Sequence, residues 1–182
     1  TDKTGTITTN QLAVTEIIPY SKVSINDLLL MGALASQESN QDPIDLAFIQ
    51  AARQRNLDLH SYKIAQFRPF DPDRRRTEVE IDDGIIKMTI LKGAVSTIIS
   101  LCAESLVLNQ WGEPILSTLA EEGTRVIALA SQKEDLKYHF LGLVGLSDPL
   151  RIDSKRLISD LQDLGIAVKV ITGDNFLIAQ HI

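Results

Sequence analysis

The stretch Thr1-Asp2-Lys3-Thr4-Gly5-Thr6-Ile7-Thr8 sets an aspartate directly before a lysine, a glycine and several threonines. A carboxylate can attack a phosphorus atom, while a neighbouring ammonium and a bound Mg²⁺ offset the charge on the transferring phosphoryl group. Glycine lets the backbone turn sharply towards a phosphate, and threonines supply hydroxyl or backbone contacts. The octet therefore predicts a phosphate-binding turn of an α/β phosphotransfer fold, with Asp2 as the nucleophile.

Composition sets the outer limits on what this chain can be. The 182 residues are 44% hydrophobic and 23% charged, which is typical of a globular protein with one large domain or one domain and part of another. The net charge of −6 argues against a nucleic-acid or anionic-membrane partner. Cys102 is the single cysteine, so it cannot form an internal disulfide, and its apolar neighbours indicate a buried structural thiol.

Apolar periodicity predicts alternating helices and strands. Helix boundaries are indicated by Ser24 or Asn26 and by Asp42 as N-caps, and by Gly123 and Gly165 at C-terminal ends. A tight turn at 82–84 is expected to join two strands. We expect helices over 25–35, 43–56, 93–103, 112–122 and 153–164, and strands ending near 18 and over 62–70, 77–81, 85–91, 124–131, 138–146 and 167–171.

The order of these segments indicates an insertion. The nucleophile turn comes first, about 120 residues of α+β sequence follow, and a helix, a short apolar strand and Thr172-Gly173-Asp174 come last. Both turns suit a Rossmann-like core, in which ligands lie at the carboxyl ends of parallel strands. We therefore predict an α/β (α+β) protein: an antiparallel-sheet domain with flanking helices over 19–146, inserted in an incomplete Rossmann-like phosphorylation domain of 1–18 and 147–182.

The sequence Asp2-Lys3-Thr4-Gly5-Thr6 resembles the phosphorylation signature of the P-type ion-pumping ATPases, whose phosphorylation domain is of the haloacid-dehalogenase type. The resemblance implies that Asp2 accepts the γ-phosphoryl group of ATP and that Thr172-Gly173-Asp174 organises the phosphoryl site. Lys3 and Thr4 belong to the same catalytic turn. It also implies Mg²⁺ bound by the Asp2 carboxylate and the Thr4 carbonyl. The inserted domain would bind the nucleotide.

Further segments fit the same family in order along the chain. Residues 67–78, with Phe-Arg-Pro-Phe-Asp-Pro followed by three arginines, Thr and Glu, resemble the proton-pumping branch. There Phe70 would stack on adenine, and one or more of Arg74, Arg75 and Arg76 would approach the phosphates. We take Arg75 as the candidate from this run.

Four other segments complete the implied nucleotide site. By resemblance, Lys92 and Gly93 of a Lys-Gly-Ala turn would line the adenine pocket, Asp45 would reach the adenine amino group, and Arg125 would contact the β-phosphate region. Asp148 and Arg151 would meet the ribose and phosphates. They lie in Asp148-Pro149-Leu150-Arg151, where Leu150 replaces a second proline that is usual in the family, which predicts a less rigid hinge.

The resemblance places this chain on the cytoplasmic side of a membrane protein whose actuator and transmembrane domains are its partners. No stretch approaches the roughly 18–20 apolar residues that span a bilayer, so we expect no direct membrane contact. The family's Gly-Asp-Gly-x-Asn-Asp motif is absent, so we expect the chain by itself to bind ATP weakly without turnover.

Two alternatives stay open. One is a phosphatase of the haloacid-dehalogenase type in which residues 19–146 form a cap. Such enzymes usually carry a second aspartate two positions after the nucleophile, where this chain has Thr4. The other is a non-catalytic module that binds adenine nucleotides.

Overall fold

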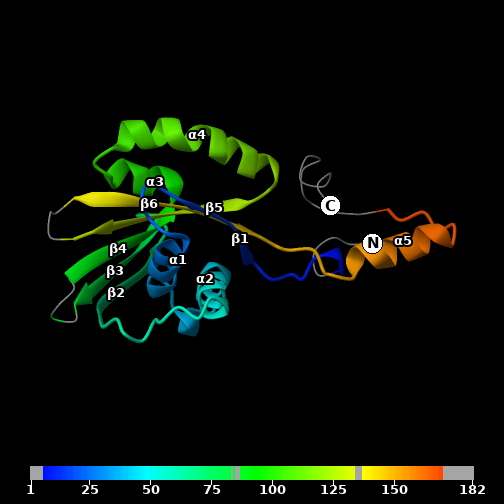
Figure 1. The fold of residues 1–182 in the computed structure, drawn as a ribbon, viewed down its shortest axis with the longest axis horizontal. Coiled ribbons are helices and arrows are strands. Elements are labelled where there is room, and N and C mark those ends of the chain that lie inside the picture. The colour runs from blue at the N-terminus through cyan, green and yellow to red at the C-terminus, as the bar shows by residue number, and fades with distance from the viewer. Residues whose placement is uncertain (1–5, 83, 85–86, 134–136, 170–182) are drawn as a thin grey trace.

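A six-stranded antiparallel sheet forms the centre of the described molecule, with strand order β1-β6-β5-β4-β3-β2. The structure is a computed structural model and describes residues 6–82, 84, 87–133 and 137–169. Figure 1 shows α1 and α2 on one face of the sheet and α3 and α4 on the other. The elements are β1 (Ala13–Pro19), α1 (Ile25–Leu34), the short 3₁₀ helix η2 (Glu38–Asn40), α2 (Pro43–Gln54), β2 (Ile64–Asp71), β3 (Arg76–Asp82), β4 (Lys87–Ala94), α3 (Val95–Leu101), α4 (Ser105–Glu121), β5 (Arg125–Gln132), β6 (Tyr138–Ser147) and α5 (Ser154–Asp163).

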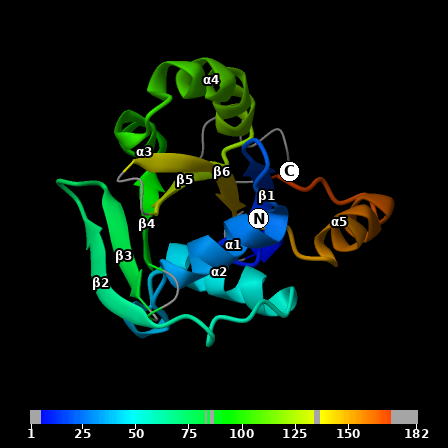
Figure 2. The same cartoon turned by 60° about the vertical axis from the view of Figure 1, so that its left-hand side comes forward.

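The core has two sides because successive strand residues point to opposite faces of a sheet. On β5, Ile127 and Leu129 pack in the cluster that contains Phe48 of α2. The alternate residues, Ala128 and Ala130, pack in the cluster of α3 and α4. The central strands are thus buried on both faces, while the β2–β3 hairpin forms one border of the sheet (Figure 2).

The predicted helix boundaries are confirmed where they depend on local chemistry. The Ser24 hydroxyl accepts a hydrogen bond from the backbone N–H of Asp27 at the start of α1. At the start of α2, the Asp42 carboxylate accepts from the N–H groups of Ile44 and Asp45. Gly123 and Gly165 follow α4 and α5 with φ values of 70° and 74°. Glycine is favoured there because it has no Cβ to clash in this conformation.

Two predictions were wrong. Helix α4 begins at Ser105, seven residues before the predicted start, and continues through Pro114. Proline lacks an N–H group and is favoured in the first turn of a helix, but Pro114 lies inside α4. In the structure, packing of Leu108 in the core keeps the preceding turn helical. The expected strand at 167–171 is absent from its described part, since residues 167–169 form no regular element.

A two-stranded connection joins the sheet to α5. Thr8 bridges Leu150, the Thr9 N–H donates to the Pro149 carbonyl, and the Arg151 N–H donates to the Ile7 carbonyl. Beyond this connection, α5 lies at the end of the molecule away from the sheet (Figure 1).

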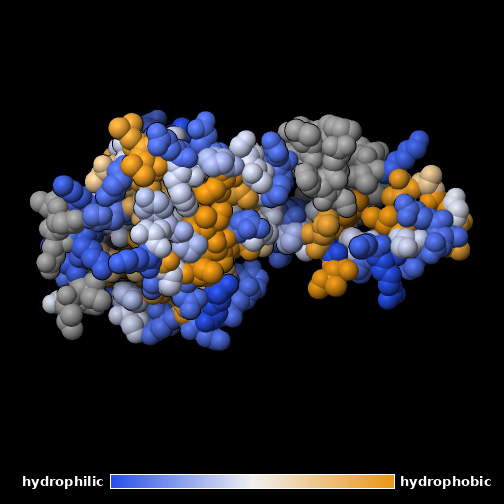
Figure 3. All heavy atoms as spheres, turned by 45° about the horizontal axis from the view of Figure 1, so that its top comes forward, coloured by the Kyte–Doolittle hydropathy of each residue, from blue (hydrophilic) through white to orange (hydrophobic). Residues whose placement is uncertain are grey.

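Apolar side chains remain exposed at that end of the molecule. Leu157 and Leu161 of α5 and Leu164 after it are exposed, and hydrophobic surface is visible there in Figure 3. Within the described residues, no helix is both long enough and apolar enough to cross a bilayer.

Candidate functional site

A cavity of about 610 Å³ lies where the C-terminal end of β4 meets the start of β5, the β2–β3 turn and the N-terminus of α2. We call it the β4 cavity. Six of the predicted binding residues line it: Asp45, Phe70, Arg75, Lys92, Gly93 and Arg125. Elements distant in sequence are therefore brought together around one space, as the resemblance implied.

The inner wall of the β4 cavity contains a buried ion pair. The Lys92 Nζ lies 2.5 Å from Asp45 Oδ1, and only 3% of Lys92 is exposed. Antiparallel pairing sets Lys92 opposite Thr77, which is also buried and also lines the cavity. A buried charge is costly unless it is paired and hydrogen-bonded, so this lysine depends on its acceptors.

Two residues that the sequence prediction missed support Lys92. The Lys92 ammonium also donates to Ser36 Oγ at 2.5 Å, and its nitrogen lies 5.1 Å from the centroid of the Phe48 ring. Phe48 follows Asp45 by three positions on α2, so the two share a helix face, and that spacing could have indicated it. Nothing in the sequence indicated Ser36, because it lies just after α1, far from Lys92 along the chain, and only the tertiary fold brings the two residues together.

Burial determines the protonation chemistry of Lys92. Desolvation lowers the pKa of its ammonium from 10.5, because removal from water disfavours the charged form. The negative charge and hydrogen bond of Asp45 oppose this effect, followed by the charge of Asp42. Desolvation is the larger effect, so the pKa of Lys92 is lowered overall.

The backbone at Arg75 is held in an uncommon conformation. Its φ of 52° is left-handed, which few non-glycine residues adopt. Hydrogen bonds fix it on both sides: the Arg75 N–H donates to Asp71, and the Arg75 carbonyl accepts from Ala94. A Cβ at Gly93 would lie 2.4 Å from that carbonyl oxygen. The absence of a side chain at Gly93 therefore makes room for the backbone of Arg75, and not only for a ligand.

The outer part of the β4 cavity combines an aromatic ring with cations. Phe70 is 59% exposed, which is unusual for a large apolar side chain and leaves its ring accessible. In the described part of the chain, neither Arg75 nor Arg125 has a side-chain hydrogen bond or ion pair. A ring that can stack and two available guanidinium groups suit a planar base that carries phosphates.

Asp148 and Arg151 do not line the β4 cavity, and their predicted contact with ribose and phosphates stays a prediction. The Asp148 carboxylate instead accepts hydrogen bonds from the hydroxyls of Thr8 and Thr9, at 2.6 and 3.1 Å, and from the Gln11 N–H. Arg151 lies 3.6 Å from Asp153. These residues follow β6 in the two-stranded connection, which takes them away from the end of β4.

The other arginines of the run at 74–76 face different partners. Arg74 pairs with Asp71 at 3.4 Å. Arg76 lies 3.7 Å from Glu78, and its Nε is buried without a hydrogen bond. Side chains alternate along β3, so Arg76 lies on the side of the sheet opposite Thr77, which explains why Arg76 does not line the β4 cavity.

The predicted phosphorylation residues lie outside the described residues. This holds for Asp2, Lys3 and Thr4, and for Thr172, Gly173 and Asp174. The predicted Mg²⁺ ligands Asp2 and Thr4 are among them. In the portions of the chain that the structure describes, no group of three or more His, Cys, Asp or Glu residues could hold a metal ion.

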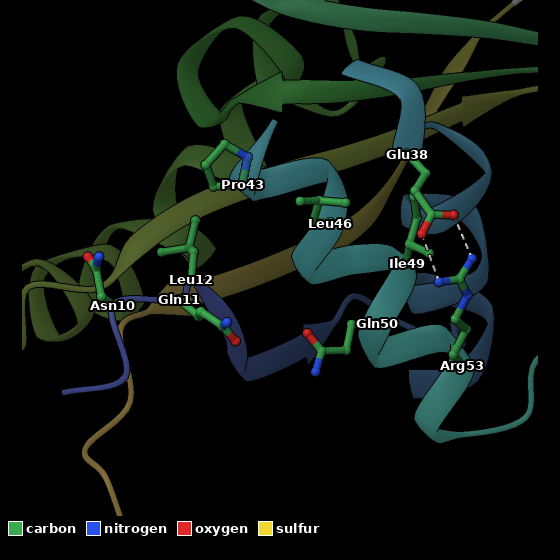
Figure 4. A pocket seen from close by; sticks show the side chains of 9 residues that line it. All are labelled: Asn10, Gln11, Leu12, Glu38, Pro43, Leu46, Ile49, Gln50 and Arg53. Atoms are coloured by element: carbon green, nitrogen blue, oxygen red, sulfur yellow. Dashed lines mark hydrogen bonds and ion pairs between the residues drawn. The ribbon is translucent and has the colours of Figure 1, made fainter. Parts of the chain in front are cut away.

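Two further cavities lie nearby. One of about 420 Å³ lies between residues 10–12 and α2, and the ion pair of Glu38 and Arg53 closes one end of it (Figure 4). This ion pair lowers the pKa of Glu38. The other, of about 700 Å³, lies against α3 and α4 and shares Arg75 with the β4 cavity. Neither brings together the predicted residues as the β4 cavity does.

Comparison with known proteins identifies the family. A family model described as a hydrolase, haloacid dehalogenase-like hydrolase, matches residues 1–182. The chain belongs to the haloacid dehalogenase-like hydrolase family. The phosphorylation-domain type expected from the aspartate signature is therefore confirmed.

The relatives are P-type ATPases. A Methanocaldococcus jannaschii protein assigned as a cation-transporting ATPase is 39% identical over 100% of this chain and 22% of its own length. Plasma membrane ATPase 1 of Schizosaccharomyces pombe is 34% identical over 99% of this chain and 21% of its own. The chain thus spans about a fifth of the curated relatives it matches.

A solved structure gives the same result. A zinc-transporting PIB-type ATPase in the E2.Pi state aligns with 98% of this chain and 26% of its own, with a TM-score of 0.74 and 25% identity. The predicted resemblance to P-type ATPases and the mixed α/β class with an antiparallel sheet are both confirmed.

Proposed function

We propose that this chain is the ATP-binding and phosphorylation region of a P-type cation-transporting ATPase, with protons as the transported ion. The observation that carries the proposal is the β4 cavity, where Phe70, Lys92 and Arg125 surround one space. Two Leishmania donovani relatives that are described as proton ATPases and are 32% identical to this chain support the choice of ion. We propose that the nucleotide-binding domain takes in the whole sheet from β1 to β6, and that the residues before Ala13 and after Ser147 belong to the phosphorylation domain. The boundary predicted at residue 18 moves because β1 (Ala13–Pro19) pairs with β6.

Each residue of the β4 cavity would have one task. The Phe70 ring would stack on adenine, since its face is exposed and every base offers a π-face. Asp45 and Lys92 would contact the polar edge of the base. Arg75 and Arg125 would bind phosphate oxygens, for which a planar guanidinium is well suited.

The chemistry would then occur at Asp2. Its carboxylate would attack the γ-phosphorus in line with the departing ADP oxygen, which leaves an aspartyl phosphate that water later hydrolyses. Asp2 and Thr4 would hold Mg²⁺, which supplies positive charge to the transferring group. In the whole protein, actuator and transmembrane domains would couple this cycle to ion movement on the cytoplasmic side of a membrane.

Calorimetric titration with ATP tests the cavity. Phe70→Ala should weaken ATP binding by about tenfold, because base stacking on an aromatic ring is lost. Ile64→Ala is the matched control, since Ile64 is an exposed apolar residue of the same strand outside the cavity. Equal affinity of the two variants for ATP would refute the proposed cavity.

A further inference from the structure

The Lys92 ammonium uses two of its donors inside the protein. It donates to Asp45 Oδ1 and to Ser36 Oγ, each at 2.5 Å. A lysine ammonium carries three N–H donors and no acceptor. One donor is therefore left, at a side chain that lines the β4 cavity.

Ser36 can serve Lys92 only as an acceptor. The Ser36 hydroxyl donates its single proton to the Gly32 carbonyl at 2.7 Å, four residues earlier. Ser36 is itself buried, with 8% of its surface exposed, so water does not compete for its oxygen. This leaves a lone pair of the Ser36 oxygen directed at the ammonium.

The segment after α1 also positions the other member of the pair. The Gln37 N–H donates to Asp45 Oδ2 at 2.9 Å, while Asp45 Oδ1 accepts from Lys92. Residues 36 and 37 therefore orient both the cation and its counter-ion. The Phe48 ring covers the ammonium at 5.1 Å.

We propose that Ser36 is a positioning residue for nucleotide binding: it holds the Lys92 ammonium so that the third N–H reaches a ring nitrogen of the purine. The inference rests on the proposed function, because it assumes that the β4 cavity takes the base. Ser36 itself does not contact the nucleotide.

A consequence for pH dependence follows from the charges around Lys92. Asp45 and Asp42 of the α2 N-terminus and Arg75 and Arg125 line the same cavity. Burial already lowers the pKa of Lys92, and Asp45 and Asp42 oppose this effect. Loss of the Ser36 acceptor removes a further stabilising contact of the ammonium, so the pKa should fall more. ATP affinity should fall as pH rises through that pKa, because neutral Lys92 loses its charge and one donor.

The experiment compares variants at position 36 with a matched control. Ser36→Ala removes the acceptor, Ser36→Cys replaces it with a poor one of similar size, and Ser36→Thr keeps the hydroxyl. Ser100→Ala is the control, since the Ser100 hydroxyl also donates to a carbonyl of its own helix, that of Thr97, and is exposed. The Lys92 ¹³Cε shift without nucleotide and the Kd for ATP are each measured against pH.

We expect Ser36→Ala and Ser36→Cys to move the Lys92 titration to lower pH and to raise the Kd for ATP near neutral pH by roughly three- to tenfold. The alkaline loss of ATP binding should begin at lower pH in the same two variants. Ser36→Thr and Ser100→Ala should match the unmodified chain in both measurements.

The outcomes separate the two proposals. An unchanged Lys92 titration in both the Ala and the Cys variant would overturn the role of Ser36, whatever ATP does. A shifted Lys92 titration with no change in ATP affinity would overturn the positioning of nucleotide by Ser36. Absence of ATP binding by the unmodified chain would overturn the proposed function, while the Lys92 titration would still decide whether Ser36 controls the ammonium.

Discussion

At the scale of single residues, the interior behind the β4 cavity leaves no spare room. A Cβ added to Gly32 would lie 2.3 Å from Cδ1 of Phe48, whose ring is fully buried beneath Lys92. Close-packed interiors resist added atoms, because the surrounding rings cannot move freely. The glycine on α1 therefore permits the aromatic contact on α2.

We predict that Gly32→Ala lowers the free energy of unfolding by about 1–3 kcal/mol, since it forces Phe48 aside. Gly112→Ala is the matched control: Gly112 also lies inside a helix, but the nearest neighbour of its added Cβ would be 3.8 Å away. Gly112→Ala should raise the free energy of unfolding by about 0.5–1 kcal/mol, because alanine favours the helix more than glycine does. Urea denaturation measures both, and a neutral Gly32→Ala would contradict the packing described.

Cys102 gives a residue-scale prediction with a pH sign. Burial raises the pKa of its thiol from 9.0 to about 11, because the thiolate is disfavoured away from water. Labelling by a thiol reagent should therefore be slow at pH 8 in the folded protein and fast in urea.

The raised pKa means that Cys102 contributes to the free energy of unfolding below pH 9, and this contribution should be lost as pH rises towards 11. The reason is that the Cys102 thiol ionises more easily in the unfolded chain than in the folded protein. The difference in unfolding free energy from Cys102→Ser should shrink over that window. Rapid labelling of the folded protein at pH 8 would show that the thiol is not buried as described.

At the scale of elements, local chemistry was predictable and tertiary contact was not. The Ser24 and Asp42 caps depend on neighbouring residues, so the sequence was sufficient to predict them. The start of α4 depends on Leu108 packing into the sheet cluster, and no local signal reports that contact. The family resemblance predicted six residues that line the β4 cavity. Ser36 could be recognised only from the fold, which brings the segment after α1 to Lys92 of β4.

Asp148 lies just after β6 and has partners in the structure other than the nucleotide that the resemblance implies. It was expected at the nucleotide, but its carboxylate binds Thr8, Thr9 and Gln11 of the opposite connecting segment. We predict that Asp148→Ala leaves the ATP affinity unchanged and increases amide hydrogen exchange over residues 8–12. Asp153→Ala, which removes an exposed carboxylate nearby, is the control and should change neither. A tenfold loss of ATP affinity in Asp148→Ala would restore the predicted nucleotide contact.

At the scale of the whole molecule, stability comes from the sheet and its four covering helices rather than from α5. Leu143 of β6 is fully buried, whereas Leu157 and Leu161 of α5 are 51% and 39% exposed.

We predict that Leu143→Ala lowers the free energy of unfolding by about 2–5 kcal/mol. The double change Leu157→Ser and Leu161→Ser should alter the sheet transition by less than about 0.5 kcal/mol. Thermal melting followed by the near-ultraviolet signal of Trp111, which packs on Tyr20, reports on the sheet side. A large loss from the double change would show that α5 supports the sheet.

The central claim is that the β4 cavity takes the nucleotide, and a titration of ATP followed by backbone amide chemical shifts tests it most directly. We expect saturable shifts at Thr77, Lys92, Gly93 and Arg125, with none at Gln50 and Arg53 in the cavity beside α2. Shifts confined to the cavity beside α2, or no saturable shift at Lys92 and Gly93, would contradict the account.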